Sequence, residues 1–444
     1  MKHLCAFFII NYQSDDTLSN HYIYCKSYRL NQRYYSLDVF RGATVALMIL
    51  VNNPGSWDYI YSPLEHAPWH GLTPTDLVFP FFLFAVGNAL AFVMPRLEAG
   101  GSGLFWKKVI KRTLLIYGIG LFLNWWPFVR WQDGHLMANG WTWVNSEGRV
   151  VGVRILGVLH RIALCYFFAS IIIYYLKTRL AFLAGLLILL FYWLLCYLGN
   201  PADPYSLSGW FGTNIDKAIL HEPHMYRENG VVFDPEGLMS TIPAIVQVIF
   251  GFLVGNYISQ RSRLAASVPK EIVLTSDELR KEKENHPYYV IITGLFIAAM
   301  AFLVAGYVWD LSFPVNKRIW TSSYVVVTTG MATAILATLI YAIEVKGMRG
   351  WWTRFFDVFG KNALFVFALS AFLPRGLRLI RIPNGTDENG NLSYISPWNW
   401  PYERIYKHIP GDPRIGSLCF ALTVILFMWA ICYWLDKKRI YIKV

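Results

Sequence analysis

Long apolar runs recur along the chain and set the tightest limit on its fold. A spanning helix needs roughly 20 mostly apolar residues, and about ten stretches reach that length. They cover 37–54, 75–95, 109–128, 155–176, 180–198, 239–258, 288–308, 321–343, 359–379 and 414–435. With 55% hydrophobic residues, the chain has more apolar surface than a soluble core can hide. We therefore predict an all-α, polytopic integral membrane bundle of about ten transmembrane helices.

Basic residues gather in alternate segments between these runs, which orients the chain in the membrane. Lys and Arg cluster after the second, fourth, sixth and eighth runs and at the end of the chain. Because cytoplasmic loops carry an excess of Lys and Arg, we predict that both termini are cytoplasmic. Residues 1–33 contain no run long enough to span, so we predict an N-terminal cytoplasmic extension followed by a transmembrane domain over 34–444. The net charge of +12 comes from these short clusters at the ends of apolar runs rather than from one long basic stripe, so we predict membrane lipids and no nucleic acid as partners.

The opposite face receives long segments rich in aromatic and amide side chains. Residues 129–153, 199–238 and 380–413 each contain Trp and Asn, and the last two also contain Tyr. Aromatic faces combined with polar groups can bind sugar rings, as they can other polar ligands with an apolar face. The alternative is a belt of aromatic residues at the membrane interface, and composition alone favours this belt.

The segment 36–84 joins two apolar runs whose ends carry most of the polar groups that a reaction could use. His66 lies in the connecting loop, where an imidazole can take a proton from an amine or hydroxyl nucleophile, as acyl transfer to a sugar requires. Asp76 opens the following helix and could orient the ring, while Asn52 ends the preceding helix and could stabilise an oxyanion. The alternative is an ordinary interfacial histidine, and His70 competes for the same role. No spacing of His and Cys residues indicates a metal site.

Charged residues near other helix ends could line the same cavity. Asp38 and Arg41 are three apart at the cytoplasmic end of the first run, where they form either a structural ion pair or a site for phosphate. Arg154 and Arg161 are seven apart and hence near one helix face. Arg161 lies inside an apolar run, so it needs a partner or a watery cavity.

Further polar residues flank later runs. Asp234 and Glu236 precede the run at 239–258, where they are either substrate ligands or carboxylates that stabilise a helix N-terminus. The remaining candidates for substrate contacts are Asn316, Lys317, Trp320 and Asn362. Residues scattered along the sequence can line one cavity when they share a membrane face.

Seven motifs, in order, resemble the heparan-alpha-glucosaminide N-acetyltransferase family. They are RYYSLDVFRG, MILVNNPGSW, LEHAPWHGLTPTDLVFPFFLFAVG, RILGVLHRIALCYF, FDPEGLMSTIPAIV, VNKRIWTSSYVVVTTG and GKNALFVF. Together they extend from residue 33 to about residue 370. A single SLDxxRG start is weak because other multi-span proteins carry it, whereas the ordered set centred on HAPWHGLTPTDLVFP is specific.

The resemblance implies a transmembrane acetyltransferase domain that uses cytosolic acetyl-CoA, without a metal, to acetylate an amino sugar or other glycan acceptor on the far side. By motif, His66 matches the family's catalytic histidine and Asn52 the asparagine that accompanies it. Asp76, Asp234 and Glu236 lie in matching motifs. The donor phosphates are expected near the basic ends of the first four spans, with the thioester at the level of His66.

This chain also departs from the family's animal enzymes. It lacks their long luminal N-terminal region, it has His70 where they have another polar residue, and its spacing from Asn52 to His66 is longer. These differences favour a bacterial-type enzyme in the bacterial cytoplasmic (inner) membrane that acts on a periplasmic or cell-surface glycan.

Three points stay open in the sequence. A multi-span transporter or a lipid-linked glycan-handling protein is the alternative function, with the intramembrane charges lining its route. His66 can act as a general base or as an acetyl carrier in a ping-pong reaction. A homodimer is compatible with the sequence.

Overall fold

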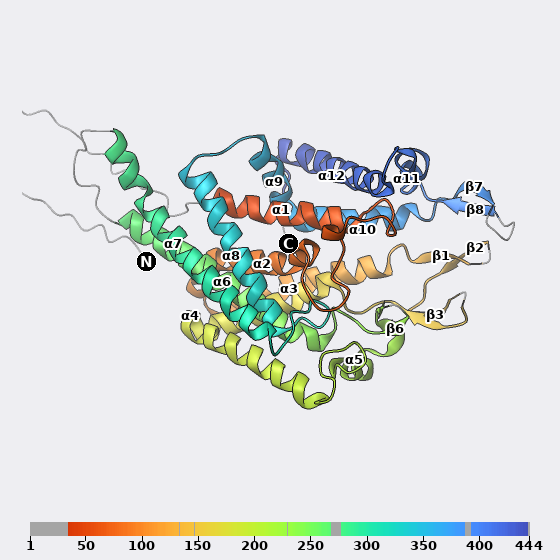
Figure 1. Cartoon of the computed structure of the whole chain (residues 1–444), viewed down its shortest axis with the longest axis horizontal. Coiled ribbons are helices and arrows are strands. Elements are labelled where there is room, and N and C mark those ends of the chain that lie inside the picture. Colours follow the sequence, from red (N-terminus) through yellow and green to blue (C-terminus); the bar gives the residue numbers. More distant parts are fainter. Residues whose placement is uncertain are drawn as a thin grey trace, which may run out of the picture. The chain divides into compact units, whose positions relative to one another are not determined.

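The computed structural model describes residues 34–132, 134–145, 147–228, 230–267, 277–386 and 392–442. Helices dominate these ranges (Figure 1). They are α1 Tyr35–Asn52, α2 Val78–Ala99, α3 Gly101–Trp125, α4 Val158–Gly199, α5 Gly212–Leu220, α6 Leu238–Ser267, α7 Asp277–Asp310, α8 Ser322–Ile340, α9 Trp351–Lys361, α10 Ala363–Leu377, α11 Trp400–Arg404 and α12 Pro413–Lys437. The predicted extension over 1–33 lies outside the described residues.

Several of these helices can cross a membrane. Within the described ranges, seven segments are long and apolar enough: Tyr35–Asn52, Pro74–Ala99, Val158–Gly199, Leu238–Arg263, Pro287–Asp310, Ser322–Val345 and Pro413–Lys437. The pair α9 and α10 adds an eighth if it is one span, with a bend of 78° between its two helices. The prediction of a helical multi-span membrane protein is confirmed in this form, whereas the number of spans and the sides of the two termini stay predictions.

Helix α4 is one reason why the predicted number of spans exceeds the number found in the described ranges. It runs for 42 residues, about twice what one span needs. Lys177 inside it has a φ of 59°, so the helix breaks there. This break falls between the predicted runs 155–176 and 180–198, which explains why the sequence shows two apolar runs where the hydrogen-bond pattern shows one helix.

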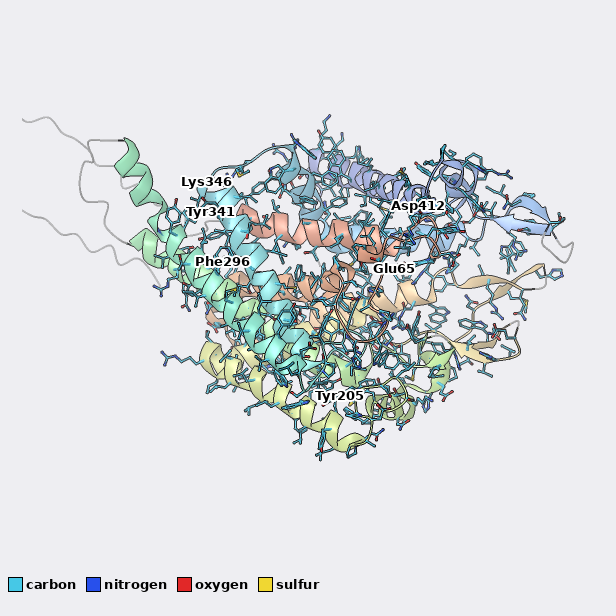
Figure 2. All side chains as sticks on the ribbon, in the orientation of Figure 1. Glu65, Tyr205, Phe296, Tyr341, Lys346 and Asp412 are labelled. Atoms are coloured by element: carbon cyan, nitrogen blue, oxygen red, sulfur yellow. The ribbon has the colours of Figure 1, made fainter. Side chains whose placement is uncertain are left out.

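The described segments between helices contain four short antiparallel hairpins. They are β1 Val129–Gln132 with β2 His135–Ala138, β3 Thr142–Val144 with β4 Val150–Gly152, β5 Arg227–Glu228 with β6 Val231–Val232, and β7 Ile382–Thr386 with β8 Leu392–Ile395. All four lie in segments predicted to be on the extracytoplasmic side. In Figure 1 the β1–β2 and β7–β8 hairpins lie at one end of the helices, and Figure 2 places Glu65 toward that end and Lys346 toward the other.

Glycines allow the central helices to approach closely. A side chain at Gly87 of α2 would collide with the backbone of α6, and one at Gly251 of α6 would collide with the backbone of α2. The same reciprocal contact occurs between Gly42 of α1 and Gly360 of α9. Small residues permit such close packing, which is important inside a membrane. The hydrophobic effect contributes little to helix association there, because lipid tails are as apolar as the side chains. These contacts hold α1 and α2 firmly, and the connection between these two helices carries the candidate site.

Candidate functional site

Asp76 organises the loop between α1 and α2. It lies in a short 3₁₀ helix, Pro74–Leu77, that leads into α2. Its Oδ2 accepts hydrogen bonds from the backbone N–H groups of Ala67 and Thr73, both at 3.1 Å. Its Oδ1 lies 2.7 Å from Nδ1 of His66. One buried carboxylate therefore folds the loop and orients the imidazole.

The two partners in this contact have very different exposure. The Asp76 side chain is 1% exposed, whereas the His66 side chain is 36% exposed. The backbone oxygen of Asp76 also accepts from the hydroxyl of Tyr324 at 2.6 Å, which ties the start of α2 to α8. Because Nδ1 of His66 faces the carboxylate, Nε2 is the ring nitrogen left to act on a ligand, and no described residue hydrogen-bonds to it.

Lys317 completes this centre from the connection between α7 and α8. Its Nζ lies 3.4 Å from Oδ1 of Asp76 and 3.1 Å from Nδ1 of His66. Burial lowers the pKa of Lys317, while Asp76 and Glu236 favour its charged form. The structure thus brings His66, Asp76 and Lys317 together, although 251 residues separate His66 from Lys317 in the sequence.

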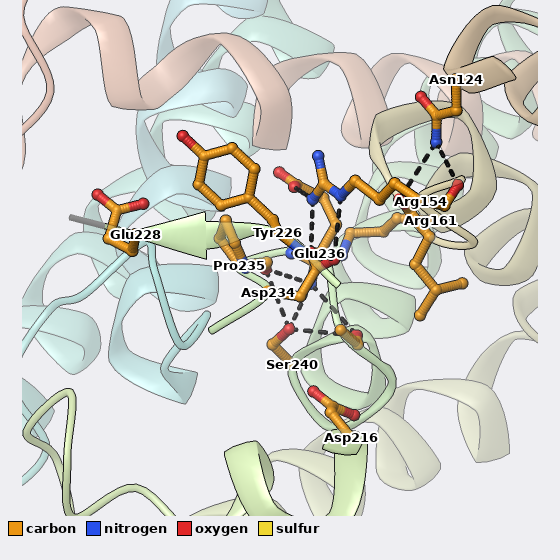
Figure 3. Close-up of polar contacts among 12 residues, drawn as sticks. Asn124, Arg154, Arg161, Asp216, Tyr226, Glu228, Asp234, Pro235, Glu236 and Ser240 are labelled. Atoms are coloured by element: carbon orange, nitrogen blue, oxygen red, sulfur yellow. Dashed lines mark hydrogen bonds and ion pairs between the residues drawn. The ribbon is translucent and has the colours of Figure 1, made fainter. Parts of the chain in front are cut away.

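A second charged cluster lies just before α6 and is drawn in Figure 3. Arg154 binds Asp234 through two hydrogen bonds, from Nε at 3.0 Å and from Nη2 at 2.5 Å, and it also pairs with Glu236. Burial disfavours the charge on Arg154, but the two carboxylates outweigh it and raise the pKa of Arg154. Burial likewise disfavours the charge on Glu236, yet Arg154 and Arg161 lower the pKa of Glu236. Arg154 and Glu236 therefore favour their charged forms.

Arg161 is fully buried in α4 and contacts the same segment. Its Nη2 donates to the backbone oxygen of Pro235 at 2.6 Å and to the hydroxyl of Ser240. Its guanidinium lies 4.8 Å from the ring centroid of Trp320. Arg161 therefore has the hydrogen-bond partners that a charge inside an apolar helix requires. The predicted shared helix face with Arg154 is wrong, because Arg154 precedes the start of α4 at Val158.

The connection between α7 and α8 joins the two clusters. Lys317 contacts the His66 centre, Trp320 lies beside Arg161, and Arg318 pairs with Glu228 at 3.1 Å. The buried Asn316 donates from its side chain toward Nδ1 of His70 at 3.3 Å. Three segments that are distant in sequence therefore form one polar region beside the loop of His66.

His66 and His70, which the sequence could not separate, have different surroundings. His66 faces Asp76, whereas His70 contacts Asn316. Burial lowers the pKa of His70, which favours its neutral form. The geometry that orients an imidazole through a carboxylate is therefore found at His66.

Four other candidates lie outside this polar region. Asn52 is exposed at the end of α1, and in the described ranges it shares no hydrogen bond with His66. Asp38 pairs with Arg41 at 2.8 Å, and Nε of Arg41 donates to the backbone of α9 at 2.8 Å. Asn362 is buried and exchanges hydrogen bonds with the backbone at residues 440 and 442. Asp38 is therefore paired within α1, Arg41 links α1 to α9, and Asn362 links the junction of α9 and α10 to the segment after α12.

The sequence analysis missed Thr73, which lies three residues before Asp76. Thr73 donates its backbone N–H to the carboxylate, and its hydroxyl lies 3.0 Å from Oδ2. The Thr-Pro-Thr-Asp spacing before an apolar run is a helix-cap signal, so this contact was accessible from the sequence. The bond from Tyr324 was not, because no local pattern relates Tyr324 to Asp76.

Comparison with known proteins identifies two relatives. No protein-family model matches the chain. The human heparan-alpha-glucosaminide N-acetyltransferase is 27% identical over 388 residues, covering 76% of this chain and 52% of the human protein. The mouse protein of the same name is 26% identical over 382 residues, covering 76% of this chain and 53% of the mouse protein. The chain spans about half the length of these relatives, and both support the family resemblance predicted from the motifs.

Proposed function

We propose that this relative of the heparan-alpha-glucosaminide N-acetyltransferases is a transmembrane acetyltransferase. It moves the acetyl group of cytosolic acetyl-CoA to the amine of a glucosamine-like sugar, or to another glycan acceptor, on the extracytoplasmic side. The observation that carries this proposal is the 2.7 Å contact between Nδ1 of His66 and the buried carboxylate of Asp76. A buried carboxylate that orients a partly exposed imidazole is the arrangement required of a general base.

In the direct reaction, His66 acts as the base. The Nδ1–H group of His66 donates a hydrogen bond to Asp76, so the lone pair of the neutral ring is on Nε2. As the acceptor nitrogen attacks the thioester carbonyl, Nε2 takes its proton. Collapse of the tetrahedral intermediate breaks the carbon–sulfur bond, and the imidazolium returns the proton to the departing thiolate. Atoms and charge balance, and the products are an acetamide and CoA.

Two other groups assist this step in the proposal. Lys317 offsets the charge of Asp76, so the carboxylate can remain ionised although it is buried. Asn52, assigned by its motif, supplies a donor to the oxyanion from the exposed end of α1. In a ping-pong variant, Nε2 of His66 attacks the thioester itself, and CoA leaves as the thiolate. The acceptor amine then attacks the acetylated ring, His66 is the leaving group, and the proton lost by the amine offsets the one that the CoA thiolate takes up.

The donor is proposed to arrive from the cytoplasmic face. Lys107, Lys108 and Lys111 are exposed on the first half of α3, where lysine ammonium groups can bind the phosphates of acetyl-CoA. Arg41 lies at the start of α1, on the same predicted face. The proposal keeps the acceptor site in the extracytoplasmic loops and assigns the enzyme to a bacterial cytoplasmic membrane, as the family resemblance implies.

The test uses purified full-length protein in detergent. It is incubated with labelled acetyl-CoA and a panel of amino sugars, and the products are analysed by mass. We expect one acetyl group to be added by the wild type and none by His66→Ala. His135→Ala, on the exposed strand β2, is the matched control and should retain activity. Near-normal transfer by a folded His66→Ala variant, or solute uptake without acetyl transfer, would contradict the proposal.

Label that remains on the protein after a single turnover without acceptor distinguishes the two mechanisms. Label retained on His66 supports the ping-pong reaction, and protein that stays unlabelled while the acetyl-CoA remains intact supports direct transfer. The distinction matters because an acetylated His66 would allow CoA to leave before the acceptor binds.

A further inference from the structure

A pocket of about 530 Å³ lies beside the loop of His66. Trp69 and His70 form one side of it, Asp203 and Tyr205 in the connection between α4 and α5 form the other, and Glu228 also contributes. This volume is within the range of roughly 300–1,000 Å³ that small-molecule sites occupy. The mechanism above uses none of these five side chains.

Hydrogen bonds and an ion pair hold the walls of the pocket. The indole N–H of Trp69 donates to the backbone oxygen of Tyr205 at 2.8 Å. The hydroxyl of Tyr205 accepts from the indole N–H of Trp193 at 3.0 Å. Glu228 is paired with Arg318 at 3.1 Å. The two loops therefore meet in a defined geometry, and the pocket is formed before a ligand binds.

The lining has the chemistry of a carbohydrate site with an excess of negative charge. Trp69 and Tyr205 offer aromatic surface, and Asp203 offers acceptor oxygens for hydroxyl or ammonium groups. Among the described lining residues there is no Lys or Arg. The charge of Glu228 is offset by Arg318, but Asp203 is exposed, and the hydrogen bond its carboxylate accepts in the described ranges comes from the hydroxyl of Ser206.

The pocket is close to the His66 centre without being part of it. His66 and His70 are four positions apart, so the chain between their Cα atoms spans at most about 14 Å. The two regions also share the connection between α7 and α8, where Lys317 contacts His66 and its neighbour Arg318 holds Glu228. A sugar chain with one residue at His66 can therefore place an adjoining residue in the pocket.

We propose that this pocket is a subsite for the sugar next to the one that is acetylated, and that it selects neutral or amine-bearing oligosaccharides over sulfated or carboxylated ones. The inference rests on the proposed function for the identity of the neighbouring site. A sulfate or carboxylate in the pocket would meet Asp203 without a compensating lining cation, and like charges placed together cost binding energy.

The test measures binding without acetyl-CoA, by titration calorimetry on purified full-length protein. The probes are glucosamine, a β-1,4-linked glucosamine trimer and a heparan sulfate tetrasaccharide, each at several salt concentrations. The salt series is needed because the chain's net charge of +12 attracts polyanions non-specifically. We expect the trimer to bind about tenfold or more tightly than either glucosamine or, at high salt, the tetrasaccharide.

Substitutions at Asp203 test whether the tighter binding of the trimer depends on this pocket. Asp203→Lys should weaken binding of the trimer by about tenfold or more, and Asp203→Asn should weaken it less because the amide oxygen can still accept a hydrogen bond. Glu147→Lys, which reverses an exposed carboxylate in the turn between β3 and β4, is the matched control and should bind like the wild type. Equal affinity for glucosamine and the trimer, or no effect of Asp203→Lys, would overturn the inference.

Acetylation measured in parallel keeps the two proposals apart. If glucosamine is acetylated but the trimer binds no more tightly, the subsite is wrong and the proposed function stands. If the trimer binds more tightly and Asp203→Lys removes that gain, but no sugar is acetylated, the proposed function is wrong and the pocket is still a glycan site.

Discussion

Replacing Asp76 by asparagine should remove activity and leave the loop folded. In the wild type, Oδ2 of Asp76 accepts from Ala67 and Thr73, and Oδ1 faces His66. An amide has one oxygen, and the two backbone N–H groups will keep it. Its N–H₂ group then faces Nδ1 of His66, which must become an acceptor. The imidazole proton moves to Nε2, so the nitrogen that faces the substrate can no longer act as a base.

The size of the loss follows from this change of tautomer. The matched aspartate-to-asparagine change in a Ser-His-Asp protease lowers kcat by about 10⁴. A loss of about 10³–10⁴ here corresponds to roughly 4–5.5 kcal/mol of barrier. Asp76→Ala is the informative comparison, because it leaves two buried N–H groups without an acceptor at about 1–3 kcal/mol each. We therefore expect the asparagine variant to be more stable than the alanine variant, although both are inactive.

The assay is acetyl transfer under saturating acetyl-CoA, with thermal unfolding in detergent on the same samples. Asp76→Asn should unfold near the wild-type temperature and Asp76→Ala clearly below it. The reasoning is refuted if Asp76→Asn keeps kcat within about tenfold of the wild type, which is only 1.4 kcal/mol. It is refuted equally if the two variants have the same stability, because the carboxylate would then not organise the loop.

Three further predictions concern charges around the site. Because burial lowers the pKa of Lys317, wild-type activity should fall at an alkaline pH below the ordinary 10.5 of lysine. Lys317→Arg should move that fall upward in a pH–rate profile, whereas Lys317→Met should cost about tenfold or more below the pH of the fall and remove the fall itself. Arg154→Met removes the ion-pair partner of two buried carboxylates and should destabilise the protein by about 3–5 kcal/mol. The unfolding temperature should recover when Asp234→Asn and Glu236→Gln are added to this variant. A triple variant that unfolds at the same temperature as Arg154→Met would contradict the role of the ion pairs. Burial raises the pKa of Asp216 from 3.8 to about 7, so the folded state holds this proton more tightly than the unfolded state, and stability is lost as the pH rises toward 7, by up to about 1.4 kcal/mol per pH unit. Asp216→Asn should flatten the change in unfolding temperature between pH 5 and pH 8, and an unchanged profile would refute this.

The sequence predicted the features that have a local signature. Apolar length located the helices, and even the break in α4 at Lys177 falls between two predicted runs. The pairing of His66 with Asp76 was also within reach, because the two residues flank one short loop. Both predictions depend on contacts between residues close in sequence.

Features made by long-range packing were not predictable. Lys317 reaches His66 across 251 residues, and no periodicity relates the two. Arg154 and Arg161 have a helical spacing, but the helix begins at Val158, after Arg154. The predicted span over 359–379 crosses the bend between α9 and α10. Each of these features depends on how distant parts of the chain pack together. A sequence pattern can therefore single out a residue but cannot identify the residues that it contacts.

The most direct test of the central claim uses proteoliposomes. Labelled acetyl-CoA is added outside, amino sugar is enclosed inside, and the acetylated sugar that accumulates inside is measured. For molecules inserted with their cytoplasmic face outward, the account predicts enclosed acetyl-sugar with the wild type and none with His66→Ala. Enclosed acetyl-sugar that forms equally well with a folded His66→Ala variant, or none with the wild type in either orientation, would contradict it.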